Sequence, residues 1–134
     1  MATSVYIVVE GEDPGFDIFV NGRAIARYEN ALEQIALRLR VRPLLEFFSA
    51  DQDSMAVVME QKNVKWGTML PRPQWFIPQE GLETVHALHE FLLANPAALG
   101  SETPLVVLEL QDFEKVLRKT GEHELRWHLA VSFR

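Results

Sequence analysis

The chain has 134 residues, of which 48% are hydrophobic and 24% are charged, and its formal net charge is −6 at pH 7. This length and composition predict a single globular domain over residues 1–134. Cysteine does not occur, which excludes disulfides, thiolate zinc sites and cysteine nucleophiles, and the negative charge opposes binding to nucleic acid or anionic lipid.

The start of the chain, MATSVYIVVEGEDPG, has no basic n-region and reads as a strand followed by a turn, not as a signal peptide. No apolar run reaches the length of about 18 residues that a membrane-spanning helix requires. We therefore expect a soluble, cytoplasmic protein with neither a membrane nor a nucleic-acid partner.

The first elements expected along the chain are strands. The run SVYIVVE at 4–10 is β-branched and aromatic and does not alternate with polar residues, which predicts a central strand. Further on, Asn21 and Gly22 separate two short segments, and an Asn-Gly pair is a strong local signal for a tight turn between strands. We therefore expect a hairpin over residues 16–26.

From residue 28 the hydrophobic period becomes helical and predicts a helix that Pro43 stops. The residues at helical spacing are Tyr28, Leu32, Ile35, Ala36 and Leu39. The next run, LLEFFS at 44–49, fits either a short helix or an extended segment. The following segment, DSMAVVMEQK at 53–62, predicts a short helix.

The second half of the chain is expected to contain two helices and a terminal strand. Prolines and a glycine predict irregular structure over 63–78, followed by a helix over 79–94 and another from Thr103, a candidate cap, to Gly121. RWHLAVSFR at 126–134 alternates like a half-buried strand. The predicted fold is α+β: about four mostly antiparallel strands, three main helices largely on one face, and terminal strands as candidate neighbours.

The segment HALHE in the 79–94 helix raises the question of a metal or acid/base site. On a helical wheel of about 100° per residue, His89 falls within the apolar face. His89 is therefore interpreted either as a core-facing histidine or as a neutral imidazole that lines a pocket. His86 falls on its border beside Glu83 and Glu90. These three residues form either a solvated polar flank or a divalent-metal or proton-transfer site.

Known patterns do not favour a metal centre. His-x-x-His-Glu is neither of the zinc-protease orders, and the Glu-x-x-His over 83–86 has no second copy for a dinuclear site. Nucleotide-binding glycine loops and the Gly-x-Ser-x-Gly elbow are also missing from the sequence. We therefore predict no cofactor, no metal ligand and no catalytic residue.

The segment over 63–78 is the more plausible binding feature, because tryptophan and arginine are common anchors of protein interfaces. Trp66, Arg72 and Trp75 lie among prolines and predict either a stiff ridge or a loop pinned to the core by its aromatic residues. The residues predicted to bind a partner are Trp66, Arg72, Trp75, His86, His89 and Glu90.

The leading hypothesis is a small noncatalytic binding or regulatory domain that recognises a protein through the 63–78 segment and nearby acidic surface. One version is an inhibitor or immunity-type protein, because negative charge speeds association with a cationic partner. A separate possibility is a homo-oligomer in which a sheet edge or the tryptophan segment forms the contact. The competing hypothesis is a metal-dependent or acid/base enzyme that uses Glu83, His86 and Glu90. The binding hypothesis requires Trp66 or Trp75 to be partly exposed.

Overall fold

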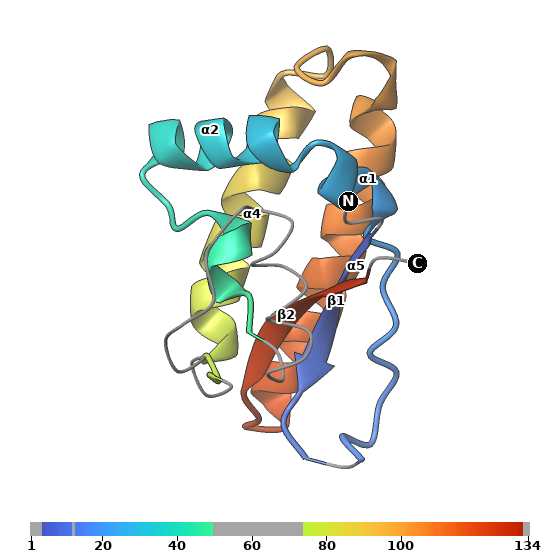
Figure 1. The fold of residues 1–134 in the computed structure, drawn as a ribbon, viewed down its shortest axis with the longest axis vertical. Coiled ribbons are helices and arrows are strands. Elements are labelled where there is room, and N and C mark those ends of the chain that lie inside the picture. Colours follow the sequence, from blue (N-terminus) through green and yellow to red (C-terminus); the bar gives the residue numbers. More distant parts are fainter. Residues whose placement is uncertain (1–3, 12, 50–73, 133–134) are drawn as a thin grey trace, which may run out of the picture.

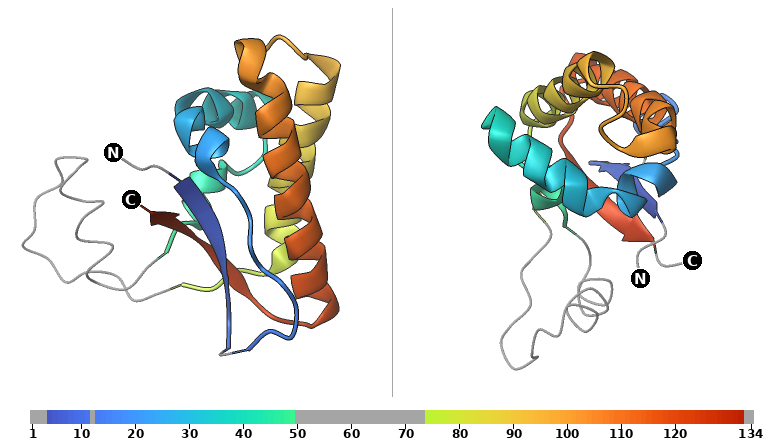
Figure 2. Two further views of the ribbon diagram at one scale, coloured as in Figure 1. Left: turned by 90° about the vertical axis from the view of Figure 1, so that its right-hand side faces the viewer. Right: turned by 90° about the horizontal axis from the view of Figure 1, so that it is seen from above.

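The computed structural model describes residues 4–11, 13–49 and 74–132, which contain two strands, four α-helices and two short 3₁₀ helices. In chain order the elements are β1 (Ser4–Val9), α1 (Arg23–Arg27), α2 (Glu29–Leu39), η1 (Leu44–Phe47), α4 (Pro78–Ala94), η2 (Gly100–Glu102), α5 (Thr103–Glu122) and β2 (Trp127–Ser132) (Figure 1). The helices α4 and α5 lie side by side on one face of the sheet (Figure 2). The fold class is α+β, as predicted.

The strands β1 and β2 pair antiparallel, with Ser4 opposite Ser132, so the first and last expected strands are neighbours, as the terminal runs suggested. One face of this sheet is apolar and packs against the helices. The pairs on that face are Val5 with Val131, Ile7 with Leu129, and Val9 with Trp127. On the other face Tyr6 is 41% exposed. The burial of β1 therefore alternates, and the prediction of a central strand buried on both faces is wrong.

The prediction of about four strands and three main helices is also wrong. The described residues form a two-stranded sheet, and they contain four α-helices. Two further apolar segments reach β2 but form only single bridges with it, Phe48 with Leu129 and Phe76 with Trp127. The chain is helical immediately beside each bridge, in η1 before Phe48 and in α4 from Pro78. Within the described residues, each segment therefore contributes a single bridge and not a strand.

The predicted hairpin over 16–26 does not form, because Asn21 and Gly22 lead into helix α1. The Oδ1 atom of Asn21 accepts a hydrogen bond from the N–H of Arg23 at 3.1 Å. A Cβ atom on Gly22 would lie 1.9 Å from the carbonyl oxygen of Val5. Gly22 has a φ of −118°, so its backbone conformation is open to other residues. Glycine is required here because the backbone passes so close to β1.

Helix α1 is only five residues long and is held by a buried carboxylate from α5. Glu109 accepts hydrogen bonds from the N–H groups of Ala24 at 3.1 Å and Ile25 at 2.9 Å. Asn21 serves the first amide of α1, and Glu109 satisfies the next two, which would otherwise be unpaired in the interior. Burial is the largest influence on Glu109 and raises its pKa, although both amide hydrogen bonds oppose the increase.

The longer helices follow the predicted positions: α2 ends near Pro43, and α4 and α5 closely match the ranges 79–94 and 103–121. Thr103 is the first residue of α5 and not its cap; its hydroxyl donates to the carbonyl of Gly100. Gly81 fixes α4 against the sheet, because a Cβ atom there would lie 2.2 Å from the ring of Trp127. The position of α4 relative to β2 therefore depends on a glycine.

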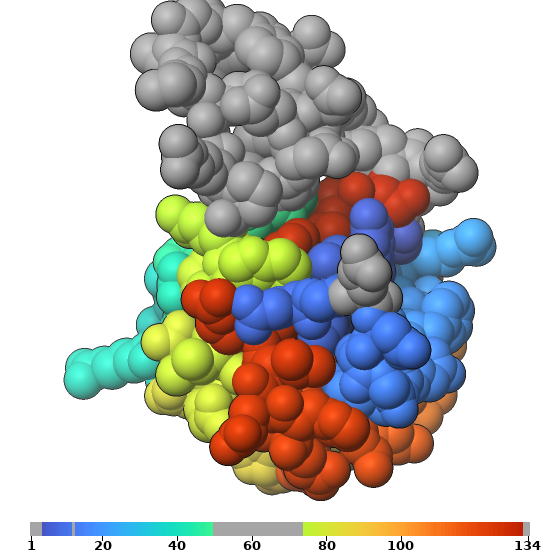
Figure 3. Space-filling view, turned by 90° about the horizontal axis from the view of Figure 1, so that it is seen from below, coloured from blue at the N-terminus to red at the C-terminus, as the bar shows by residue number. Residues whose placement is uncertain are grey.

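A clamp joins the end of β1 to the start of β2. Glu10 accepts a hydrogen bond from Arg126, with Oε2 and Nη2 2.6 Å apart. The hydrogen bond from Arg126 holds the pKa of Glu10 below its ordinary value. Nearby, the rings of Phe16 and His123 lie with their centroids 4.8 Å apart. The loop after β1 and the end of α5 therefore meet at this end of the molecule (Figure 3).

The helix predicted over 53–62 lies outside the described residues. None of the helices that the structure describes is both long and apolar enough to cross a membrane.

Candidate functional site

The predicted binding residues that the structure describes are Trp75, His86, His89 and Glu90. Trp66 and Arg72 lie outside the described residues. Trp75 precedes α4, whereas the other three residues belong to α4 itself. The structure separates the described candidates into two surfaces, one between α4 and α5 and one on the sheet.

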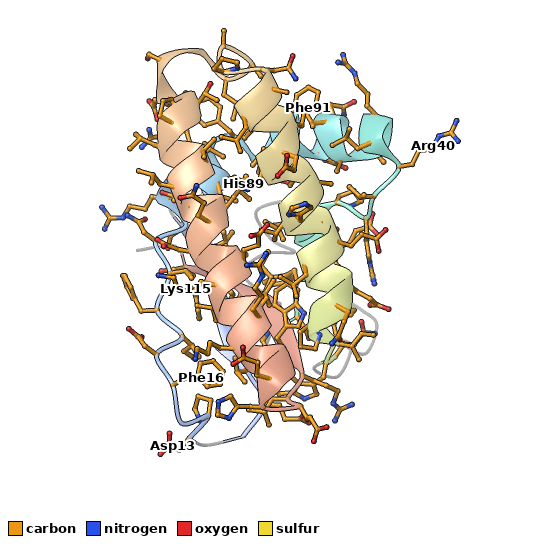
Figure 4. The ribbon with its side chains drawn as sticks, turned by 180° about the vertical axis from the view of Figure 1, so that it is seen from behind. Asp13, Phe16, Arg40, His89, Phe91 and Lys115 are labelled. Carbon is orange, nitrogen blue, oxygen red and sulfur yellow. The ribbon has the colours of Figure 1, made fainter. Side chains whose placement is uncertain are left out.

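His86 and His89 converge on Glu114 of the neighbouring helix α5. His86 Nδ1 lies 2.9 Å from Glu114 Oε1, and His89 Nδ1 lies 4.0 Å from the same oxygen. The Glu114 side chain is 11% exposed, whereas that of His86 is 56% exposed. The two histidines are therefore related through a buried carboxylate of the neighbouring helix. Figure 4 shows His89 beside the line where α4 and α5 meet.

A cation on the same helix also contacts Glu114. Arg118 lies one turn further along α5, with Nη2 3.2 Å from Glu114 Oε2. A buried carboxylate is costly unless its oxygens receive hydrogen bonds or face positive charge. His86 serves one oxygen and Arg118 the other, which explains how a glutamate is tolerated at this position.

The hydrogen-bond partners indicate which ring nitrogen of each histidine donates and which accepts. Glu114 can only accept from His86, so His86 is protonated on Nδ1 and its Nε2 is left as the free acceptor. Gln111 Nε2 lies 3.2 Å from His89 Nε2 and can only donate to it, so His89 also carries its proton on Nδ1. Among the described residues, His89 Nδ1 has no hydrogen-bond partner.

The three-residue site considered from the sequence is not assembled. His86 Nε2 lies 3.9 Å from Glu90 Oε1. Glu83 is exposed and makes no hydrogen bond or ion pair within the part of the chain that the structure describes. Over the same residues, no three histidine, aspartate or glutamate side chains form a group suited to a metal ion. The cluster instead offers one free imidazole nitrogen beside one carboxylate.

The second surface lies on the sheet face opposite the helices. There the ring of Trp75 contacts that of His128, with centroids 4.7 Å apart and planes inclined at 50°. His128 is opposite Val8 in the register, and the neighbouring pair is Tyr6 with Ala130. Trp75 is partly exposed and Tyr6 is 41% exposed, so both present an aromatic ring on this face.

His128 is the buried base of this surface, with 6% of the residue exposed. Burial lowers the pKa of His128, and the hydrogen bond from Nδ1 to the carbonyl of Leu129, at 3.1 Å, opposes that decrease. A neutral imidazole beneath Trp75 keeps this part of the sheet face uncharged, which suits contact with an apolar or aromatic group.

Comparison of the chain with known protein families, curated proteins and solved structures found no match. We therefore infer its function from the two surfaces. The cluster around Glu114 is polar and largely satisfied by its own hydrogen bonds, whereas the sheet face presents partly exposed aromatic rings.

The sequence did not identify three members of the polar cluster, Gln111, Glu114 and Arg118. One signal was available, because Glu114 lies on the apolar stripe of α5 with Leu110 and Leu117. A carboxylate on a buried stripe requires a partner. The identity of that partner depends on how α4 and α5 align, which neither helix encodes alone.

Proposed function

We propose that this protein is a noncatalytic binding domain that recognises a positively charged protein through the sheet face carrying Tyr6 and Trp75. The observation that supports this proposal is the position of Trp75, partly exposed against His128 and on the same face as Tyr6. Partly exposed aromatic side chains bury large apolar areas on binding and keep a polar tip for hydrogen bonding. They are common anchors of protein interfaces.

The arrangement around these rings fits a preformed docking face. Tyr6 lies opposite Ala130 in the register; Ala130 is buried, whereas Tyr6 is 41% exposed and can contact a partner. Trp75 is kept in place by His128 beneath it. A side chain held in position by packing loses less conformational entropy on binding than a free one, so more of its contact energy remains as affinity.

Charge favours a basic partner. The chain carries a formal net charge of −6, and such a charge raises the rate of association with a cationic protein. The same charge disfavours self-association, because two copies repel each other. An inhibitor or immunity-type role against a basic protein therefore fits better than a homo-oligomer.

The enzyme hypothesis receives less support. Glu83 stands apart from His86, and the buried carboxylate of Glu114 is already occupied by His86 and Arg118. A general base requires a nearby group from which it takes a proton. Among the described residues, the hydrogen bonds and ion pairs of His86 Nε2 extend only to Glu90.

The experiment that tests the proposal is site-specific photo-crosslinking in the native host, with the crosslinking residue at position 6 or, as a control, at position 108. Leu108 is 57% exposed on α5, so it reports encounters at a comparably exposed position on a helix. We expect a basic protein to be crosslinked from position 6 only. The same product from both positions, a second copy of this chain, or an acidic partner would each contradict the proposal.

Affinity for the purified partner then tests the two aromatic anchors. Tyr6→Thr and Trp75→Ala should each weaken binding by about tenfold or more, as interface hot spots do. Leu108→Ser should leave the affinity unchanged. The association rate should fall as salt is added, because electrostatic steering is screened. Equal affinities for all three variants would rule out the sheet face as the binding surface.

A further inference from the structure

The polar cluster between α4 and α5 contains a feature that the sheet-face proposal does not use. His86 is an exposed imidazole, yet a buried carboxylate is committed to one of its nitrogens: Glu114 Oε1 lies 2.9 Å from Nδ1. This contact fixes the Nδ1–H tautomer and turns the lone pair of Nε2 toward the surface of α4. The same arrangement, carboxylate to imidazole to metal, orients histidine ligands in metalloproteins and increases their basicity.

The free nitrogen of His86 faces a second ligand type. Glu90 is four residues further along α4, and its Oε1 lies 3.9 Å from His86 Nε2. That distance exceeds the hydrogen-bond range of about 3.2 Å. A zinc ion binds imidazole nitrogen at about 2.0–2.1 Å and carboxylate oxygen at about 2.0–2.2 Å, which holds the two atoms about 3.4 Å apart in tetrahedral coordination. Because both side chains are exposed, a small rotation about their side-chain bonds lets one ion bind both atoms.

We propose that His86 and Glu90 form a two-ligand site for a divalent transition-metal ion of the zinc, nickel or copper type, with Glu114 as the positioning residue. Imidazole and carboxylate ligands suit these ions better than they suit magnesium or calcium. The side chains of His86 and Glu90 are 56% and 61% exposed, so water can complete the coordination. Such a site is independent of the sheet-face binding proposed above.

The surface position is favoured over one deeper in the cluster, among His86, His89 and Glu114. One oxygen of Glu114 already accepts a hydrogen bond from His86, and the guanidinium of Arg118 lies 3.2 Å from the other oxygen. An ion bound there would have to displace the hydrogen bond and would face repulsion from Arg118. At His86 Nε2 an ion keeps both contacts of Glu114 intact.

The test is titration of the untagged full chain with zinc chloride, followed by calorimetry and by imidazole nitrogen NMR. We expect one zinc ion per chain and a shift of the His86 Nε2 resonance. His86→Gln and Glu90→Gln should each weaken binding by about tenfold or more, while Glu83→Gln and His123→Gln should not. Glu83 is the matched acid on the same helix, and His123 is the matched exposed histidine.

Glu114→Gln separates a positioning role from a structural one. Loss of a partner of this kind typically costs about 10–100-fold in metal affinity, and we expect that loss together with a mixture of His86 tautomers in the NMR spectrum. The site is overturned if the chain shows no saturable zinc binding, or if His86→Gln binds zinc as the unchanged chain does. Unchanged affinity and tautomer in Glu114→Gln would overturn the positioning role.

Discussion

Glu114 of α5 and His86 of α4 are hydrogen-bonded across the interface of these two helices, with 2.9 Å between Oε1 and Nδ1. The two partners are not equivalent. Glu114 is largely buried, so its carboxylate depends on its neighbours for hydrogen bonds, whereas the exposed His86 can bind water instead. The cost of breaking this contact should therefore appear mainly when His86 is changed, because the buried carboxylate of Glu114 then loses a hydrogen-bond donor.

His86→Ala should lower the free energy of unfolding by about 1–2 kcal/mol, because it leaves one oxygen of the buried Glu114 carboxylate without its donor. Arg118→Ala should cost less than about 1 kcal/mol, since the Arg118 side chain is 64% exposed and its ion pair is screened by solvent. Urea denaturation at neutral pH, followed by tryptophan fluorescence, measures both values. A cost for Arg118→Ala equal to or above that for His86→Ala would show that the guanidinium, and not His86, is the main support of the carboxylate.

Gly81→Ala should destabilise the protein by about 1–3 kcal/mol, the usual cost of overpacking, because the added Cβ would lie 2.2 Å from Cζ2 of Trp127. This cost outweighs the helix propensity gained from alanine, about 1 kcal/mol. Gly121→Ala is the matched control in α5, where the nearest atom to the added Cβ is 3.6 Å away. It should be neutral or stabilising, and thermal denaturation of the two variants should move in opposite directions. A stable Gly81→Ala would mean that α4 can move away from β2.

The positions of the long helices could be predicted because their apolar residues recur at helical spacing and prolines lie near their ends. The hairpin at Asn21 and Gly22 could not, because the same two residues also suit a helix start and a close backbone contact. Gly22 is needed where its Cα approaches Val5, a contact that exists only once β1 and α1 are packed together. An Asn-Gly pair indicates which backbone conformations are allowed at that position, and the tertiary contacts determine which of them forms.

The candidate sites show the same division. The helical wheel separates His86 from His89, and the structure confirms this separation, because the His89 side chain is 13% exposed and that of His86 is 56% exposed. The helical wheel does not predict that both histidines approach Glu114, because Glu114 lies on another helix. Similarly, alternation indicates that His128 occupies the less apolar face of the last strand, but only the bridge between Phe76 and Trp127 brings Trp75 onto it.

Glu109→Ala should lower the free energy of unfolding by about 2–4 kcal/mol, because it leaves the N–H groups of Ala24 and Ile25 without their acceptor. Glu109→Gln keeps one acceptor oxygen and should cost roughly half as much. Amide hydrogen exchange should accelerate at Ala24 and Ile25 before the rest of the protein opens. Protection that is unchanged at those two amides would show that α1 is held by its packing alone.

The stability of the protein should fall on acidification because of His128. Burial lowers the pKa of this histidine in the folded protein below the value of 6.5 expected for the unfolded chain. Between those two values the unfolded chain binds a proton that the folded protein does not, so unfolding takes up a proton. The contribution is fully present above 6.5 and is lost as the pH falls through the folded-state pKa.

His128→Phe tests this linkage, because phenylalanine keeps a ring against Trp75 and removes the titrating group. The free energy of unfolding should decrease from about pH 7.5 to about pH 5.5 more steeply for the unchanged chain than for the variant, by at most about 1.4 kcal/mol per pH unit for one proton. His123→Gln, which removes an exposed imidazole, is the matched control for the loss of a histidine. If His128→Phe has the same pH dependence as the unchanged chain, proton uptake by other groups causes the acid sensitivity. In that case burial does not keep His128 neutral beneath Trp75, and the uncharged character inferred for the sheet face would be wrong.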